Sequence, residues 1–191
     1  MIPRYFLFIF LCLLTLHSIS QTKFEKEYRL KEDQVPAKAI NFVEPQKLDT
    51  KVKWYYEENF EGNSIEAKFK YDGRRYSVEF DTSGVLQDIE IEALPIERPG
   101  NLNKLILEQW DLNFKKYKYV KLQFQYSGAI KSFDDFLRSE DPEQDYTMKY
   151  ELVLKVRTEE GWKMYELLYD QDDTLERKSR IVFRNTDNLE F

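Results

Sequence analysis

The chain has 191 residues and a formal net charge of −6, with 35 acidic and 29 basic side chains, one Cys and one His. An acidic chain without runs of Lys or Arg is a poor ligand for nucleic acid and for anionic lipid. Cys12 and His17 both lie in the first 20 residues, so the remainder carries no thiol or imidazole for nucleophilic catalysis or zinc binding. We therefore predict no catalytic residue, no metal site and no cofactor.

Residues 1–20 have the pattern of a signal peptide. A single basic residue precedes the apolar run 5–16, which is too short to span a bilayer as a helix. The small residues Ser18 and Ser20 predict cleavage before Gln21. We expect a periplasmic or secreted protein with no membrane span after cleavage; the alternative is an uncleaved anchor.

The first half of the remaining chain predicts one helix followed by four strands. Residues 21–31 are polar and charged, and we expect a loose leader there. A helix is predicted to begin at Val35-Pro36, because proline fits the first helical turn, and to end before Pro45. Apolar and polar residues then alternate with period two, which is typical of half-buried strands. The predicted strands are 51–57, 65–71, 74–81 and 85–92, joined by turns at 61–63, Asp72-Gly73 and 81–84.

The second half repeats this order. A Pro- and Gly-containing stretch, 93–100, predicts a boundary, and Asn101 can cap a second helix that ends near Phe114. Strands are predicted at 117–126, 148–154, 162–170 and 175–184. An insertion, 127–146, follows the first of them and contains a short amphipathic helix at 132–137.

The best evidence for duplication is a strand–turn–strand unit that occurs twice. It reads Tyr76-x-Val78-x-Phe80-Asp81-x-x-Gly84-x-Leu86 in the first half and Tyr165-x-Leu167-x-Tyr169-Asp170-x-x-Asp173-x-Leu175 in the second. We therefore predict an α+β fold of two tandem repeats, 32–98 and 99–191. Each repeat is expected to be one helix packed on its own four-stranded antiparallel sheet, with the insertion in the second. Val78 and Phe80 are expected to be buried against Ile40 and Val43 of the first helix.

The first copy of this unit, together with Val35-Pro36 and Trp54, resembles the bacterial PepSY-like family, also described as β-lactamase-inhibitor-like. The resemblance covers nearly all of the chain after residue 20, although Asp173 replaces the glycine in the second copy and the insertion departs from the basic repeat. It implies tandem helix-plus-four-strand repeats in an exported protein with a binding or inhibitory role. It supplies no catalytic motif.

A helix on one side of each sheet leaves the other side open. Period-two alternation places on that open face five candidate binding residues: Tyr55, Arg75, Tyr117, Tyr119 and Lys121. Clustered aromatic and Arg side chains on an open face are typical of an interaction surface. We therefore predict an exported, non-enzymatic protein that binds another protein or a cell-envelope component through this face and does not bind nucleic acid.

Two other functions remain open. Paired acidic residues such as Glu57-Glu58 or Glu90-x-Glu92 could serve a hydrolase of the cell envelope that uses carboxylates alone, although chance pairs on a solvated strand are expected in so acidic a chain. The second of these functions is that of a structural module in an envelope assembly.

The stretch Asp170-x-Asp172-Asp173 begins like a calcium loop but lacks the later Gly and Glu of such loops, so a polar turn is favoured.

Overall fold

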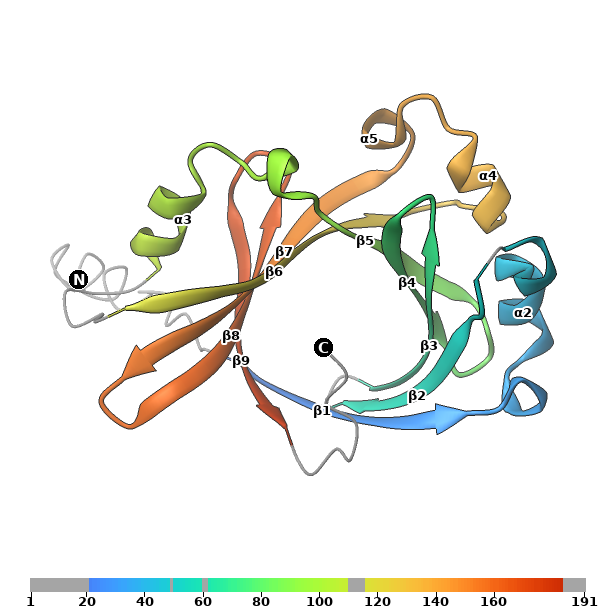
Figure 1. The fold of residues 1–191 in the computed structure, drawn as a ribbon, viewed down its shortest axis with the longest axis horizontal. Coiled ribbons are helices and arrows are strands. Elements are labelled where there is room, and N and C mark those ends of the chain that lie inside the picture. Colours follow the sequence, from blue (N-terminus) through green and yellow to red (C-terminus); the bar gives the residue numbers. More distant parts are fainter. Residues whose placement is uncertain (1–20, 49, 60–61, 110–115, 184–191) are drawn as a thin grey trace, which may run out of the picture.

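The computed structural model describes residues 21–48, 50–59, 62–109 and 116–183 (Figure 1). The predicted signal peptide lies outside these residues. The described chain forms a single β-sheet of nine strands that closes into a barrel in sequence order. The strands are β1 (Gln21–Leu30), β2 (Lys53–Asn59), β3 (Gly62–Tyr71), β4 (Arg74–Asp81), β5 (Leu86–Glu92), β6 (Tyr117–Ser127), β7 (Thr147–Thr158), β8 (Gly161–Asp170) and β9 (Leu175–Phe183).

The prediction of two repeats, each with its own four-stranded sheet, is wrong. Strands β5 and β6, from the two halves, pair antiparallel from Ile89 opposite Tyr126 to Glu92 opposite Gln123. The segment predicted as a loose leader is strand β1, which pairs antiparallel with β2 and parallel with β9. Two separate sheets would each leave edge strands with unpaired backbone N–H and C=O groups, whereas closure into one barrel pairs these edges.

The helices lie on the outside of the barrel (Figure 1). They are α2 (Ala37–Val43), α3 (Leu102–Glu108), α4 (Phe133–Leu137) and α5 (Pro142–Asp145), and short 3-10 helices cover Glu32–Gln34, Pro45–Lys47 and Pro95–Glu97. The predicted insertion thus carries two of them, α4 where a helix was expected and α5 where a loop was expected. None of the helices in the described part of the chain is long and apolar enough to cross a membrane.

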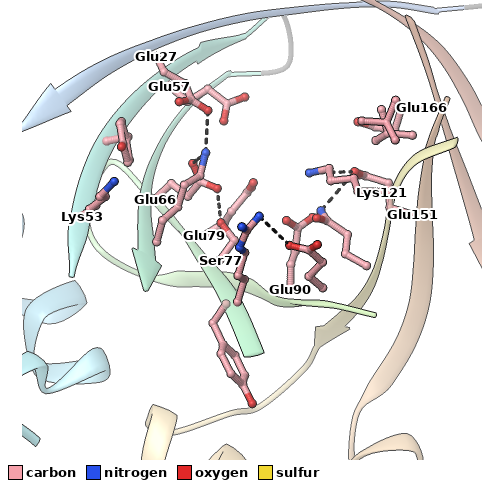
Figure 2. A pocket seen from close by; sticks show the side chains of 18 of the residues that line it. Glu27, Lys53, Glu57, Glu66, Ser77, Glu79, Glu90, Lys121, Glu151 and Glu166 are labelled. Atoms are coloured by element: carbon pink, nitrogen blue, oxygen red, sulfur yellow. Dashed lines mark hydrogen bonds and ion pairs between the residues drawn. The ribbon is translucent and has the colours of Figure 1, made fainter. Parts of the chain in front are cut away.

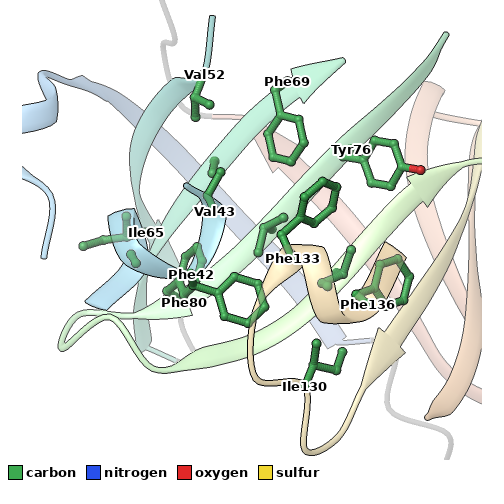
Figure 3. Close-up of a cluster of buried hydrophobic side chains, with 14 of the residues drawn as sticks. Phe42, Val43, Val52, Ile65, Phe69, Tyr76, Phe80, Ile130, Phe133 and Phe136 are labelled. Atoms are coloured by element: carbon green, nitrogen blue, oxygen red, sulfur yellow. The ribbon is translucent and has the colours of Figure 1, made fainter. Parts of the chain in front are cut away.

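Helices α2 and α4 bury the outer face of the first half of the barrel. Val78 and Phe80 of β4 are fully buried in one cluster with Val43, and the rings of Phe42 and Phe80 meet edge to face with centroids 5.5 Å apart. The predicted burial of this strand under the first helix is confirmed. Phe133 of α4 extends the cluster toward β3 and β4 (Figure 3).

Helix α3 covers the second half in the same manner. Leu105 and Ile106 pack in one cluster with Leu152, Leu167 and Tyr169, all of them buried. Apolar residues at alternate strand positions therefore face outward, toward the helices. Because successive side chains in a strand point to opposite faces, the polar residues between them point into the barrel.

The turn between β4 and β5 shows how closely the first helix approaches the sheet. Gly84 has φ of +82°, and a Cβ built on it would lie 2.9 Å from Pro36 Cβ and 3.0 Å from the Ala39 backbone nitrogen. Glycine adopts this backbone conformation without the steric cost of a side chain. The position therefore requires glycine both for its φ and for the close contact with the start of α2.

Candidate binding cavity

The inner face of the barrel is rich in buried carboxylates. Five glutamates have at most 7% of their surface exposed, and each comes from a different strand. They are Glu57 of β2, Glu66 of β3, Glu90 of β5, Glu151 of β7 and Glu166 of β8. Ionised groups are costly to bury without partners, so this arrangement needs a physical explanation.

These side chains surround a cavity of about 1040 Å³ inside the barrel (Figure 2). Glu27, Glu57, Glu66, Glu79 and Glu90 come from five consecutive strands, β1 to β5, and we call them the carboxylate cluster. Lys121, Glu151 and Glu166 come from β6, β7 and β8 and lie across the cavity from Glu57 and Glu66.

Carboxylate oxygens within the cluster lie close enough to share one positive charge. One oxygen each from Glu27, Glu57 and Glu66 lie within 4.8 Å of one another, and the same holds for Glu66, Glu79 and Glu90. Glu66 belongs to both groups because it stands in the middle of the row, opposite Tyr55 on β2 and Glu79 on β4. Either group could hold a cation.

Lys68 shows that an ammonium group fits these carboxylates. Its Nζ lies 2.8 Å from Glu27 Oε1 and 2.8 Å from Glu66 Oε2. Burial alone would lower the pKa of this amine, but the two carboxylates outweigh it and hold the pKa of Lys68 above its usual value. The lysine therefore stays charged and neutralises part of the first group of carboxylates.

Glu79 has a different environment. Removal from bulk solvent raises the pKa of its carboxyl group, and the negative charges of Asp88, Glu90, Glu66 and Glu57 raise it further, so that it lies well above 4.5. Two adjacent carboxyl groups do not both ionise without cost. A cation bound at this point would relieve the repulsion and favour loss of the proton from Glu79.

The hydroxyl group of Ser64 is buried beside the carboxylate cluster. Ser64 is 4% exposed, and its Oγ makes no hydrogen bond to the residues that the structure describes. It stands opposite Glu57 in the β2–β3 register and two residues before Glu66, so it shares the inner face with both, although it is not among the residues that line the cavity. Buried hydroxyl groups in proteins are usually hydrogen-bonded.

The wall formed by β6 to β9 balances its own charges. Glu151 Oε1 accepts a hydrogen bond of 3.2 Å from the Gln123 amide and lies 4.0 Å from Lys121 Nζ. Glu166 Oε1 lies 3.2 Å from the Arg177 guanidinium. Four aliphatic or thioether side chains complete this side of the cavity lining: Val120, Val153, Met164 and Ile181.

One mouth of the cavity is basic. The lining residues there that are both basic and exposed are Lys51, Lys53, Lys70, Arg75, Lys118 and Lys155. They lie near the starts of β2, β4 and β6 and near the ends of β3 and β7, which meet at one end of an antiparallel barrel. The cavity thus has buried carboxylates inside and exposed cations at this mouth.

The structure brings together only part of the predicted binding face. Tyr55, Arg75 and Lys121 line the cavity, as does Tyr119. Tyr117 and Tyr119, however, pack against the outer cluster under α3, and Tyr117 donates a 2.7 Å hydrogen bond to Asn103 Oδ1.

A β-bulge explains this difference. The register between β6 and β7 shifts between Tyr119 and Lys121, so Val120 is an extra residue and the alternation reverses there. Period-two alternation puts Tyr117 on the inner face only if the strand is unbroken, so the placement predicted for Tyr117 was wrong.

Sequence reasoning missed the carboxylate cluster. Its glutamates alternate with core residues, as Glu79 does with Val78 and Phe80, and this signal was interpreted as a solvated strand face. Only closure of the sheet turns that face into an interior. The prediction of no metal site also did not anticipate carboxylate groups able to hold a cation.

Comparisons of the chain with protein-family models, with curated proteins and with solved structures give no match. The resemblance to the PepSY-like family therefore stays a prediction based on the residues quoted above.

Proposed function

We propose that this protein is an exported, non-enzymatic binding protein that holds a small ligand with a positively charged group inside the barrel. The observation that carries the proposal is the convergence of five glutamates from β1 to β5 on one side of a cavity of about 1040 Å³ inside the barrel. Cavities of this size suit small-molecule ligands. The ligand's cation would interact favourably with these carboxylates.

The buried hydroxyl of Ser64 adds support for a ligand beside Glu57 and Glu66. Ser64 does not line the cavity, but it shares the inner face with both glutamates, and its Oγ makes no hydrogen bond to the residues that the structure describes. A ligand ammonium is a hydrogen-bond donor and would be bound by the carboxylates that line the cavity.

Closure of the barrel also changes the kind of partner we propose. The sequence favoured another protein or an envelope component on an open sheet face, but the inner face now encloses a cavity. A folded protein surface is too large for that space, whereas a small molecule or a short segment of chain fits. We therefore no longer propose a protein-sized partner on this face.

The test measures stabilisation of the purified protein by probes of opposite charge. Butylammonium, spermidine and calcium are compared with butyrate by thermal shift and by calorimetry. We expect at least one cation to raise the melting temperature, because ligands that bind only the folded state stabilise it. Equal stabilisation by butyrate, or no effect from any cation, would overturn the proposal.

Two variants locate the binding. Glu79→Gln should weaken cation binding, whereas Glu159→Gln, in the exposed turn between β7 and β8, is the matched control and should not. Ser64→Ala should leave the melting temperature of the free protein nearly unchanged, because its hydroxyl makes no hydrogen bond to the residues that the structure describes. Binding that Glu79→Gln does not affect would place the ligand elsewhere.

A carboxylate-based hydrolase is the second candidate. Its supporting observation is that carboxylates face one another across the cavity and that one of them, Glu79, has a raised pKa (Figure 2). Such pairs serve as acid and nucleophile or base in glycoside hydrolysis. Turnover of nitrophenyl glycosides that Glu79→Gln abolishes would establish this alternative in place of simple binding.

A further inference from the structure

We propose that the ligand is a zwitterion with well-separated charges, of the size of a short peptide. Its ammonium group would lie on the carboxylate cluster and its carboxylate at the basic mouth. The contact of the ammonium group with the carboxylate cluster rests on the proposed function. The contact of the ligand's carboxylate is inferred from a different set of residues, the basic side chains at the mouth. A zwitterion is thus the class of molecule that the cavity as a whole would accept.

Negative and positive side chains occupy different parts of the cavity. Glu57, Glu66 and Glu90 are buried, whereas Lys70 and Arg75 are exposed at one end. A ligand with only positive charge would meet repulsion at this mouth before it reached the carboxylates. A ligand that carries one charge of each sign complements both regions.

The distance between the carboxylate cluster and the basic mouth suits a short peptide. Glu66 and Lys70 lie four residues apart on the inner face of β3, as do Arg75 and Glu79 on β4. Four residues of strand span roughly 13 Å, and the flexible basic side chains can shorten the gap. An extended tripeptide spans about 10 Å between its terminal groups, whereas the charges of a single amino acid are far too close together.

The wall opposite the carboxylate cluster can contact an uncharged part of the ligand. Val153, Met164 and Ile181 give it an apolar surface, and its glutamates are already engaged by Lys121 and Arg177. This wall offers contact to an uncharged middle part of the ligand, such as an aliphatic side chain. The three regions together match a terminal ammonium, an apolar centre and a terminal carboxylate.

The experiment uses four forms of one tripeptide, Ala-Leu-Ala, titrated into the purified protein by calorimetry at neutral pH and low salt. The unmodified peptide carries both charges, the C-terminal amide only the ammonium, the N-acetyl form only the carboxylate, and the doubly blocked form neither. We expect the unmodified peptide to bind about tenfold tighter than either singly blocked form, which corresponds to about 1.4 kcal/mol. The doubly blocked form should bind weakest.

The outcomes separate this inference from the proposed function. If the amide binds as tightly as the unmodified peptide, the mouth plays no part and the zwitterion is ruled out, while cation binding stands. If the acetylated form equals the unmodified peptide, both proposals fail. If none of the peptides binds while butylammonium or calcium does, the cavity takes cations of another class and the inference is overturned alone.

Variants at the two ends provide a second readout. Glu79→Gln should weaken the binding of the unmodified peptide and of the amide but not that of the acetylated form. The double change Lys70→Gln with Lys155→Gln should weaken the binding of the unmodified peptide and of the acetylated form but not that of the amide. Lys104→Gln, an exposed lysine on α3 outside the barrel, is the matched control and should change none of the affinities. Loss of this selectivity would contradict the placement of the two charges.

Discussion

The two halves of the barrel are alike on the outside and different on the inside. Each half presents apolar strand residues to a helix, Phe80 to α2 and Leu167 to the cluster under α3. On the inside, the wall from β1 to β5 gathers five glutamates, two of which Lys68 bridges, whereas the wall from β6 to β9 carries two, Glu151 and Glu166, each beside a neighbouring amide or guanidinium group. The outer packing is thus similar in both halves, while the charge pattern differs on the face that lines the cavity.

The hairpin turns sharpen this comparison. Asp81 Oδ1 accepts hydrogen bonds from the Ser83 and Val85 backbone nitrogens, and Asp170 Oδ1 accepts the corresponding pair from Asp172 and Thr174. The backbone is therefore the same in both turns, and the difference lies in the last turn residue.

In the first turn that residue is Gly84, which touches the start of α2. In the second it is Asp173, which accepts a hydrogen bond from Tyr150 and one of 2.7 Å from Asn101 at the start of α3. Close contact at one turn is replaced by hydrogen bonds at the other. These bonds hold the pKa of Asp173 below its usual value.

The largest effects should come from the outer clusters and should be similar in the two halves. Phe80→Ala should destabilise the protein by about 3–5 kcal/mol and Leu167→Ala by about 2–5 kcal/mol, because each removes a fully buried side chain and leaves a cavity. Urea unfolding followed by circular dichroism measures both. A cost below about 1 kcal/mol in one half only would show that the two outer faces are not equivalent.

The next effect concerns the turns, and it should differ between the halves. Gly84→Ala should cost about 1–3 kcal/mol, because it places a Cβ at positive φ and against Pro36. Asp173→Asn should cost less, since asparagine tolerates this backbone conformation and keeps an acceptor oxygen. Thermal unfolding of both variants compares them; equal melting temperatures would contradict the contact with α2.

A matched pair of substitutions should give opposite signs on the two inner walls. Glu166→Gln should destabilise the protein by about 1–3 kcal/mol, because it removes the charge that engages Arg177. Glu79→Gln should stabilise it by about 0.5–1 kcal/mol at neutral pH, because Glu79 stands directly opposite Glu66. Chemical denaturation provides the values, and the same sign for both would refute the difference between the walls.

The smallest effect is on the pH dependence of stability. The pKa of Glu79 is raised in the folded state. Its contribution to the stability of the folded protein is therefore fully present below about pH 4.5 and is lost as the pH rises through the raised pKa. Melting temperatures measured upward from acid pH should therefore show a steeper decline in the wild-type protein than in Glu79→Gln. Parallel profiles would mean that Glu79 ionises normally.

The amino-acid sequence by itself predicted much of the local structure. Alternation located β4 and β8, Gly84 and Asp72-Gly73 marked turns, and the spacing from Ala39 to Val43 identified the helix that buries Phe80. These features depend on side-chain period and turn chemistry, which neighbouring residues decide.

Only the tertiary structure decided the site. Pairing of β5 with β6 and the insertion of β1 between β2 and β9 are contacts between segments far apart in the chain, and no local pattern specifies them. The bulge at Val120 reverses the faces of β6, and no local sequence pattern indicates it either. Closure then turned a row of polar residues that alternation alone assigns to solvent into the wall of a cavity, because which face of a sheet is inside depends on where its edges meet.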